Sequence, residues 1–410
     1  MGYVGKRDAL PIVIDGLKKL EYRGYDSAGV ALWNGKDFFV KKNAGRVADL
    51  EQNVQSSVLH TLSGNTAIAH TRWATHGKPT DANAHPHGDC KNEIFVVHNG
   101  IIENHTELKD ALKREGHVFL SETDSEVISH LIERQFTFGE KISLDTAVVE
   151  ALRHVDGTFG IAVISAQDPG KIISARRGSP IVIGVGESEY AVASDISAIV
   201  EITPHVIYLH DNELAIIEKS GFKILNFGNK IVERVPEKVD WDVGFAQKGG
   251  FAHFMKKEIF EQPETLKNSI RGRILNSGFA KLGGLEDVKD RFLSSKKITI
   301  AACGTSYYAG MLGKYFLEEI AQIPVSIERA SEFRYRNPVI GADSTAIFIS
   351  QSGETADTLY ALREAKKKGA LTLGVVNVVG STIARESDAG VYNHAGPEIG
   401  VASTKAFLSQ

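Results

Sequence analysis

Apolar residues follow two different patterns along the chain, and the change of pattern divides it into two parts. Up to about residue 225, short runs rich in valine and isoleucine, bounded by Gly, Asp or Ser, predict β-strands. The clearest runs are Ile94–Val97, Gly160–Ser165, Pro180–Gly184 and Tyr190–Ser194. Many strands with few helices predict stacked sheets that carry helices on their outer faces.

Two helices are expected within this first part. One begins near the N-cap residue Asp8 and places five apolar residues on one face: Leu10, Val13, Ile14, Leu17 and Leu20. The other opens at Thr123, with Glu126 three residues later at the spacing of a capping box. Its expected apolar face consists of Val127, Ile128, Leu131 and Ile132.

The pattern changes after residues 226–253, which are polar or glycine-bearing and carry no sustained period. The next apolar spacing predicts a helix whose face is formed by Leu266, Ile270 and Ile274. Strand-like runs then alternate with helical patterns, at Lys297–Ala302, Ala346–Ile349 and Leu371–Val376. We therefore expect a first domain over residues 1–225, a linker over 226–253, and a parallel, doubly wound α/β domain over 254–410.

Composition narrows the class of protein. The 410 residues are 42% hydrophobic, with 47 basic and 51 acidic side chains and a net charge of −4, as in a globular protein without a basic surface for nucleic acid. No apolar run approaches the roughly 20 residues of a membrane-spanning helix, and no basic-then-apolar leader follows Met1. We expect a soluble, cytoplasmic protein with no nucleic-acid or membrane partner.

Two strand-to-helix loops in the second part share one design. Ala301–Ser306 and Ile349–Thr355 each carry an apolar strand into small hydroxyl residues and glycine that open a helix. Ligands of open parallel sheets bind beyond the carboxyl ends of the strands, where helix N-termini offer backbone N–H groups to phosphate. Since no Gly-x-x-x-x-Gly-Lys-Ser/Thr run is present, the pair predicts a small phosphorylated ligand rather than a nucleoside triphosphate. The alternative is that these serines only cap helices.

Polar residues gather at three places in the first part: His70–Gly77, His98–Gly100 and Glu122–Asp124. An arginine together with an aspartate suits a substrate that bears both a carboxylate and an ammonium group, as an amino acid does. Asn99 and the N–H of Gly100 could donate hydrogen bonds to a developing oxyanion. The alternative is that Asn-Gly forms a hairpin turn.

The histidines of this part raise the question of a metal site, at His70, His76, His85, His87 and His98. Their spacings fit no helical His-x-x-x-His pair, and the nearest cysteine, Cys90, lies in a polar loop. With only Cys303 besides, the chain has neither a disulfide framework nor a four-cysteine zinc site. We expect no metal and no cofactor.

Taken together, these segments resemble the glutamine–fructose-6-phosphate aminotransferases (isomerizing). The matching segments are Leu20–Gly29, Thr71–Gly77, His98–Gly100, Lys257–Pro263, Ser350–Thr355 and Glu398–Phe407. The resemblance implies a class II glutaminase domain of N-terminal-nucleophile fold, an α/β/β/α sandwich, followed by a sugar-isomerase (SIS) domain. It also implies conversion of fructose 6-phosphate and L-glutamine to glucosamine 6-phosphate and glutamate, and a homodimer in the full-length form.

The resemblance assigns roles to individual residues. Glutamine would be bound by Arg72, Thr75, His76 and Asp124. Asn99 and Gly100 would form the oxyanion hole, and Trp73 would gate the ammonia path. The sugar phosphate would be held by Thr305, Ser306, Ser350, Gln351, Ser352 and Thr355, with Val401 and Ser403 in the segment that lines the sugar site.

Two departures from the family pattern bear on activity. The family's mature chain begins Cys-Gly-Ile-Val-Gly and attacks glutamine with its first cysteine, whereas this sequence begins Met1-Gly2-Tyr3-Val4-Gly5. A thioether cannot become a thiolate, and Cys90 would substitute only if it folded into the pocket beside a base. The sequence ends at Gln410, before the second isomerase lobe of the family.

We therefore expect this polypeptide, as a truncated synthase sequence, to be inactive as written. The alternative is a non-catalytic regulatory protein that binds an amino acid and a sugar phosphate. A related amidotransferase that makes phosphoribosylamine is not favoured, because the second part lacks a phosphoribosyl-pyrophosphate pattern.

Overall fold

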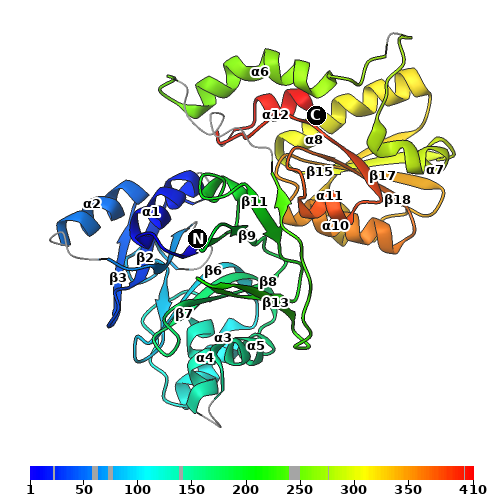
Figure 1. The fold of residues 1–410 in the computed structure, drawn as a ribbon. Coiled ribbons are helices and arrows are strands. Elements are labelled where there is room, and N and C mark those ends of the chain that lie inside the picture. The colour runs from blue at the N-terminus through cyan, green and yellow to red at the C-terminus, as the bar shows by residue number, and fades with distance from the viewer. Residues whose placement is uncertain are drawn as a thin grey trace. The chain divides into compact units, whose positions relative to one another are not determined.

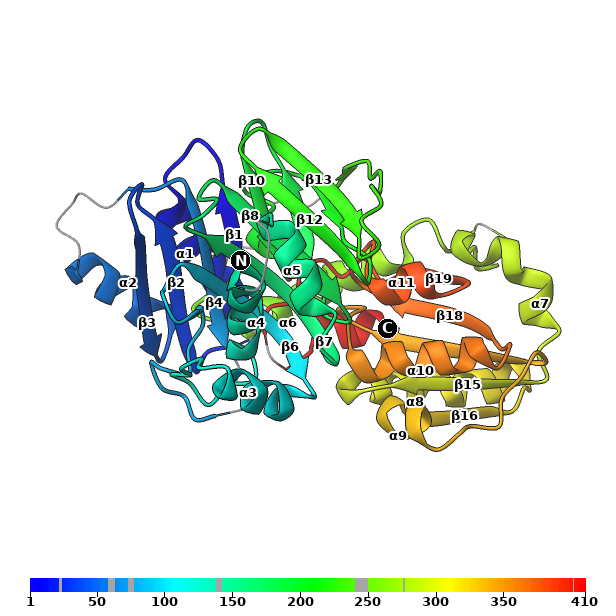
Figure 2. The ribbon, with the colours of Figure 1, turned by 90° about the horizontal axis from the view of Figure 1, so that it is seen from below.

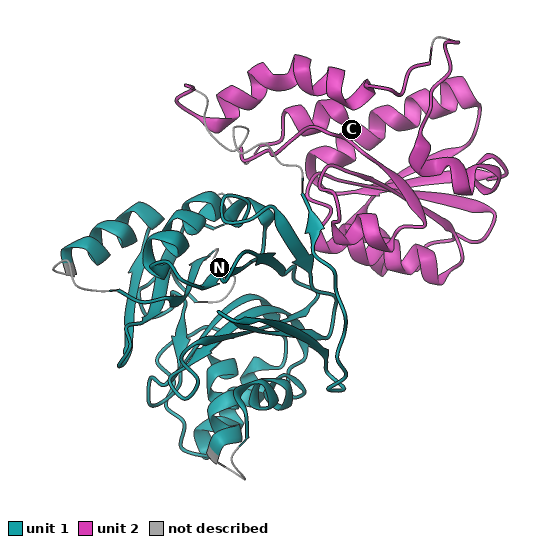
Figure 3. Cartoon of the chain, in the orientation of Figure 1, with its two compact units in different colours: residues 1–243 teal, residues 244–410 magenta. Residues whose placement is uncertain are grey.

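The chain forms two compact units, Met1–Val243 and Gly244–Gln410, shown in separate colours in Figure 3. The computed structural model describes residues 1–21, 24–57, 63–72, 77–137, 142–239, 250–275, 277–400 and 402–410. Over those ranges, no helix has the length and apolar character needed to cross a membrane. The domain boundary predicted at residues 226–253 stays a prediction. Two residues of this stretch, Glu237–Lys238, form a strand of the first unit.

The first unit is built mainly of antiparallel strands. Its strands are β1 (Gly2–Val4), β2 (Ser27–Trp33), β3 (Phe38–Ala44), β4 (Thr66–Arg72), β5 (His87–Gly88), β6 (Ile94–Ile102), β7 (Gly157–Ser165), β8 (Lys171–Arg177), β9 (Val182–Val185), β10 (Tyr190–Ala193), β11 (His205–Tyr208), β12 (Glu213–Glu218), β13 (Gly221–Asn226) and β14 (Glu237–Lys238). Its α-helices are α1 (Ala9–Leu20), α2 (Val47–Ser57), α3 (His105–Arg114), α4 (Glu126–Thr137) and α5 (Leu144–Leu152).

These strands form two sheets. The eight-stranded sheet has the order β14-β11-β9-β10-β1-β4-β2-β3, and the six-stranded sheet has the order β13-β12-β8-β7-β6-β5. The short strand β1 lies inside the larger sheet, where Gly2 pairs with Ile68 on one side and with Val192 on the other. The N-terminal segment is therefore held between two neighbouring strands.

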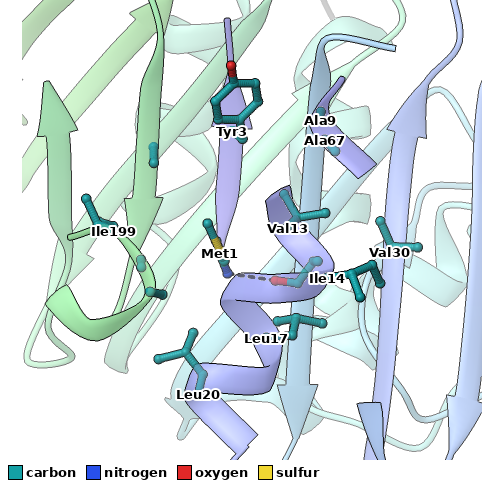
Figure 4. Close-up of a cluster of buried hydrophobic side chains, with 14 of the residues drawn as sticks. Met1, Tyr3, Ala9, Val13, Ile14, Leu17, Leu20, Val30, Ala67 and Ile199 are labelled. Carbon is teal, nitrogen blue, oxygen red and sulfur yellow. Dashed lines mark hydrogen bonds between the residues drawn. The ribbon is translucent and has the colours of Figure 1, made fainter. Parts of the chain in front are cut away.

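Three apolar cores separate four layers (Figures 1 and 2). Val13 and Leu17 of α1 pack against the outer face of the eight-stranded sheet, as Figure 4 shows. Ile68 and Phe95 belong to the core between the two sheets. Ile128 belongs to the core between α4, α5 and the six-stranded sheet. The predicted α/β/β/α sandwich is confirmed.

Local sequence signals explain where the first helices begin. The carboxylate of Asp8 accepts a hydrogen bond from the N–H of Leu10, as predicted for an N-cap. The predicted start of the second helix at Thr123 is wrong, because α4 begins at Glu126. The Glu126 carboxylate does not form the predicted capping box. It accepts hydrogen bonds from the N–H groups of Leu120 and Ser121 instead. The four apolar residues predicted for this helix are all fully buried.

The second unit alternates strands and helices. Its strands are β15 (Lys297–Ala302), β16 (Val325–Arg329), β17 (Ser344–Ser350), β18 (Leu371–Val376) and β19 (Ala389–Tyr392). Its α-helices are α6 (Phe254–Ile270), α7 (Lys289–Leu293), α8 (Gly304–Phe316), α9 (Ala330–Tyr335), α10 (Ala356–Lys367), α11 (Thr382–Glu386) and α12 (Lys405–Ser409). The strands form one parallel sheet of order β16-β15-β17-β18-β19, so the predicted doubly wound α/β domain is confirmed.

One predicted helix face in this unit is wrong. Helix α6 ends at Ile270, and Leu266, Ile270 and Ile274 are 43%, 44% and 65% exposed. The buried side chains of α6 are instead mostly polar, and they include Lys257 and Glu258. Apolar spacing alone identified the helix but not the face that packs.

Candidate active site

A cavity of about 210 Å³ in the first unit brings together polar residues from three separate segments. Its lining includes Arg72 at the end of β4, Asn99 and Gly100 in β6, and Asp124 just before α4. These are four of the residues that the sequence singled out for glutamine binding and the oxyanion hole. The other two, Thr75 and His76, lie outside the described residues, as does Trp73, the residue predicted to gate the ammonia path. At this size the cavity suits a ligand smaller than the drug-sized molecules that occupy pockets of about 300–1,000 Å³.

Arg72 places a buried positive charge at this cavity. Its side chain is 6% exposed, and its Nη1 atom lies 3.8 Å from the Asp26 carboxylate. The Nη2 group donates to the carbonyl oxygen of Gly77 at 3.1 Å. Burial lowers the pKa of Arg72, and the nearby Asp26 and Asp124 carboxylates oppose that effect. Since an arginine pKa starts far above neutrality, the guanidinium stays charged.

Asp124 supplies the complementary negative charge. It is 3% exposed, and its Oδ2 atom accepts a hydrogen bond from the backbone N–H of Ile102 at 2.8 Å. The Ser125 hydroxyl donates to the other oxygen at 3.3 Å. A fixed carboxylate and a fixed guanidinium at one cavity match the two charged groups of an amino acid.

Asn99 and Gly100 lie within a regular strand and not in a turn. Asn99 pairs with Gly160, and Gly100 pairs with Phe159 of β7. The hairpin-turn alternative for this dipeptide is therefore wrong. Gly100 has a φ of +144°, and a Cβ atom there would lie 2.1 Å from the carbonyl oxygen of Thr158. Only glycine fits at this position, because the strand takes a left-handed conformation against its neighbour.

A cluster of buried histidines lies beside these residues. His70, His85 and His98 line the cavity, and the His70 and His85 rings stack with centroids 4.4 Å apart. The backbone N–H of His98 donates to Nδ1 of His85, and its ring contacts the Ser125 hydroxyl at 2.7 Å. Burial lowers the pKa of all three, so they are neutral at physiological pH. The sequence analysis considered these three histidines individually only as metal ligands, although His70 and His98 also begin two of the polar segments that it singled out.

Neither cysteine of the sequence is part of this cavity. Cys90 lies in the turn between β5 and β6, and it does not belong to the lining. Cys303 is the N-cap residue of α8 in the second unit.

In the second unit, the two hydroxyl-rich loops follow adjacent strands. β15 pairs with β17 so that Ala302 lies opposite Ile349, and both strands end at the same edge of the sheet. β15 also lies where the strand order reverses, since β16 flanks it on one side and β17 on the other. Ligands of doubly wound sheets bind at such a switch point.

The loop after β17 is organised by its own hydroxyl groups. Ser350 is 2% exposed, and its oxygen accepts from the N–H of Gly353 and contacts the Thr355 hydroxyl at 3.0 Å. The Ser352 hydroxyl accepts from the N–H of Glu354 at 3.1 Å. The remaining predicted residues are placed as follows: Gln351 in the same loop, Thr305 exposed and Ser306 buried in the first turn of α8, and Val401 outside the described residues.

Acidic residues that the sequence analysis did not single out organise the C-terminal segment. Glu258 of α6 accepts from the N–H groups of Ile399 and Gly400. Glu398 accepts from the Ser403 hydroxyl at 2.7 Å and from the N–H of Thr404 at 2.8 Å. The predicted site residue Ser403 is thus bound within its own segment. Helix α6 and helix α12 pack against each other, a contact that a linear sequence does not reveal.

Comparison with known proteins identifies the family. Residues 70–201 match the family model of a glutamine amidotransferase domain, and residues 291–410 match that of the SIS domain. A protein of Chlorobaculum tepidum named glutamine–fructose-6-phosphate aminotransferase [isomerizing] is 52% identical over 411 residues, covering 100% of this chain and 67% of that protein. The chain belongs to the glutamine–fructose-6-phosphate aminotransferase (isomerizing) family.

Other relatives agree with this assignment. An aminotransferase of the same name from Clostridium tetani is 48% identical over 410 residues, covering 100% of this chain and 66% of that protein. The chain therefore spans about two thirds of the length of these aminotransferases, which are enzymes of the transferase class. A solved C-terminal domain of the glucosamine-fructose-6-phosphate aminotransferase from Francisella tularensis is 46% identical, covers 40% of this chain and 46% of that chain, and has a TM-score of 0.38.

Proposed function

We propose that this chain serves the glutamine-dependent conversion of fructose 6-phosphate to glucosamine 6-phosphate and glutamate, with the amide donor bound in the first unit. The observation that carries the proposal is the meeting of Arg72, Asn99, Gly100 and Asp124 at one cavity. Three distant segments thus bring a guanidinium, a carboxylate and an amide to the same small space.

The proposed roles follow from the chemistry of L-glutamine. Arg72 pairs with the α-carboxylate through two parallel N–H groups, and Asp124 accepts from the α-ammonium group. The side-chain amide of glutamine then faces Asn99 and Gly100. Their N–H groups donate to its carbonyl oxygen more strongly as negative charge develops there, which lowers the barrier to attack on the amide.

For the second unit, we propose that the loops after β15 and β17 hold the phosphate of fructose 6-phosphate. The support is their adjacency at the switch point of the sheet and the two helix N-termini that open there. Ser352, Thr355 and Thr305 would contact the phosphate, whereas Ser350 shapes the loop from a buried position. A homodimer of the longer family form stays a prediction.

We further infer that the 410-residue polypeptide binds glutamine without hydrolysing it. The sequence has two cysteines, and neither lines the cavity. The purified polypeptide should release no glutamate from glutamine above the blank; steady turnover that disappears in the Cys90→Ala variant would overturn this inference.

Calorimetric titration with L-glutamine tests the binding proposal. Arg72→Lys and Asp124→Asn should each weaken binding by at least about tenfold, because a lysine cannot form the paired bonds and an amide carries no charge. Arg7→Lys is the matched control, since Arg7 belongs to the same unit but pairs with Glu189 away from the cavity. Equal affinity in all four proteins would contradict the proposal.

A further inference from the structure

Four side chains with metal-binding atoms converge in the first unit, on residues that do not line the cavity described above. The atoms are Sγ of Cys90, Nδ1 of His117, Nδ1 of His130 and a carboxylate oxygen of Glu133, all within 4.8 Å of one another. The sulfur lies 3.7 Å from His117 and 3.6 Å from His130, and the two nitrogens are 3.3 Å apart. Glu133 Oε2 lies 2.9 Å from His117 and 3.2 Å from His130.

These separations match the edges of a small tetrahedron. Zinc–ligand bonds of 2.0–2.3 Å in tetrahedral geometry place neighbouring ligand atoms roughly 3.3–3.8 Å apart. The separations of 3.3, 3.6 and 3.7 Å among the sulfur and the two nitrogens fall in that range, and the two contacts of Glu133, at 2.9 and 3.2 Å, are shorter. The Glu133 Oε2 atom is the common point of the cluster, since it lies within hydrogen-bond distance of both Nδ1 atoms and also accepts from the backbone N–H of Cys90 at 3.3 Å.

The surroundings of the cluster are those of bound metal ligands. The N–H of Val118 points at the Cys90 sulfur at 3.4 Å. His130 is 1% exposed at its side chain, and its Nε2 lies 3.8 Å from a Glu126 oxygen. Within the described residues, that Nε2 has no hydrogen-bond partner. The Glu126 carboxylate is thus the nearest acidic group to the second nitrogen of His130, at a distance longer than a hydrogen bond.

Three segments of the chain supply the four ligands. The Asp89 carboxylate accepts from the N–H groups of Glu93 and Ile94 and so shapes the turn that presents Cys90. His117 follows Gly116, whose φ of +99° ends α3. His130 and Glu133 are separated by one turn of α4. Side-chain exposures of 11% for His117 and 12% for Glu133 leave Cys90 as the outward side of the cluster.

We propose that Cys90, His117, His130 and Glu133 bind one zinc ion. The donor set of one sulfur, two nitrogens and one oxygen suits zinc rather than magnesium or calcium. Four protein ligands fill a tetrahedral shell and leave no position for substrate, so the ion is structural. It ties the β5–β6 turn, the segment after α3 and helix α4 together, and so steadies the stretch from His117 to Asp124.

The sequence analysis expected no metal because it tested five histidines that are not among these ligands. Of the four residues, it considered only Cys90, as the nearest cysteine to those histidines. The ligands are separated by 27, 13 and 3 positions, a spacing that fits no short zinc motif. Folding, and not sequence spacing, brings them together.

Elemental analysis of the full 410-residue chain, after incubation with zinc and removal of excess metal, tests the proposal. The wild-type chain should retain about one zinc per molecule, and Cys90→Ala and His117→Ala should each retain less than about a tenth of that. Cys303→Ala removes the other cysteine and should retain the wild-type amount. Replacement of zinc by Co²⁺ should give the visible absorption of a tetrahedral thiolate complex in the wild type and not in Cys90→Ala.

Thermal unfolding provides a second measurement that does not depend on glutamine or on activity. A strong chelator should lower the Tm of the wild type by roughly 5–10 °C and leave that of Cys90→Ala unchanged. Because Cys90 is at the surface, its alanine variant is expected to fold. A wild-type chain that retains no zinc, or variants that retain as much zinc as the wild type, would overturn the proposal. Loss of glutamine binding alone would bear only on the proposed function.

Discussion

Gly100 has both a structural role in its strand and a proposed role in ligand binding. Its φ of +144° and the approach of the Thr158 carbonyl exclude any side chain, while its N–H is proposed to face the reacting amide. Because glycine has no side chain, the same position also allows a backbone N–H donor to come close to a ligand. The Asn-Gly dipeptide is a signal of both a turn and a donor pair, and the structure distinguishes the two.

We predict that Gly100→Ala destabilises the first unit by about 2–5 kcal/mol, from backbone strain and a clash with Thr158. Urea unfolding of the purified variants measures this. Gly116→Ala is the control, because Gly116 has a φ of +99° but open space around it, so only the strain of about 1–3 kcal/mol applies. Equal destabilisation in the two variants would show that the clash with Thr158 does not matter.

The buried histidines make a second prediction at this scale. The pKa of His70 is lowered well below its ordinary value, first by burial and then by neighbouring positive charge that includes Arg72. The unfolded chain therefore takes up a proton below about pH 6.5 that the folded chain does not. The free energy of unfolding should have its maximum contribution from these histidines above about pH 6.5. Below that pH it should fall by about 1.4 kcal/mol per pH unit for each such histidine.

Denaturant unfolding between pH 7 and pH 5 measures this slope. His70→Gln should reduce the pH dependence of the free energy of unfolding by the amount that corresponds to about one proton. Replacement of the exposed His205 should leave this pH dependence unchanged. A wild-type free energy of unfolding that stays flat over this range would contradict the assignment of neutral buried histidines.

At the scale of elements, helix α6 and the segment before α12 depend on each other. Glu258 accepts from two backbone N–H groups of residues 399–400, and Lys405, which is 1% exposed, donates to Glu261 at 2.7 Å. The carboxylates of Glu258 and Glu261 thus provide hydrogen-bond acceptors to a segment whose described residues have no regular backbone hydrogen bonds of their own. Burial raises the pKa of Glu258, and the N–H groups that it accepts from oppose that rise.

We predict that Glu258→Ala leaves two half-buried N–H groups without this acceptor and destabilises the segment by about 1–3 kcal/mol. Hydrogen exchange of residues 398–406 measures the effect, which should be an increase of roughly tenfold to a hundredfold in rate. Glu264→Ala on the same helix is the control, since Glu264 pairs with exposed Lys267 and Arg271. Equal exchange rates in both variants would contradict the role of Glu258.

Elements with strong local signals could be predicted from the sequence. β15 and β18 have the predicted bounds, and α1 follows its predicted N-cap, because these segments combine apolar periodicity with clear boundaries. The start of α4 was missed because Glu126 binds backbone groups before the helix instead of Thr123. The exposed face of α6 was missed because buried polar contacts, and not apolar spacing, decide which face packs.

The candidate site could be predicted only in part, for a related reason. Arg72, Asn99, Gly100 and Asp124 belong to short motifs, so their types and neighbours were informative. The buried histidines of the cavity, the acidic residues of the C-terminal segment and the Cys90 cluster are assembled from distant parts of the chain. Spacing along the sequence carries no information on such contacts.

At the scale of the whole molecule, the two units present two different chemistries. The first offers a cavity with fixed charges, and the second offers two loops at the switch point of a parallel sheet. Each proposed ligand therefore has its own unit, and changes at one proposed site should leave the other unaffected.

We predict that fructose 6-phosphate raises the Tm of the chain and that the double variant Ser350→Ala, Ser352→Ala abolishes this shift. The reason is that the variant removes the hydroxyl that shapes the loop after β17 and one that would contact the phosphate. Glutamine binding, followed by calorimetry, should be unchanged in the same variant. A persistent Tm shift with fructose 6-phosphate would place the sugar phosphate elsewhere.

A crystal structure of the chain with L-glutamate tests the central claim most directly. The account predicts that the ligand occupies the cavity of the first unit, with its α-carboxylate on Arg72, its α-ammonium group on Asp124, and its side-chain carboxylate at Asn99 and Gly100. A ligand bound outside this cavity, or bound in it with the α-carboxylate away from Arg72, would contradict the account.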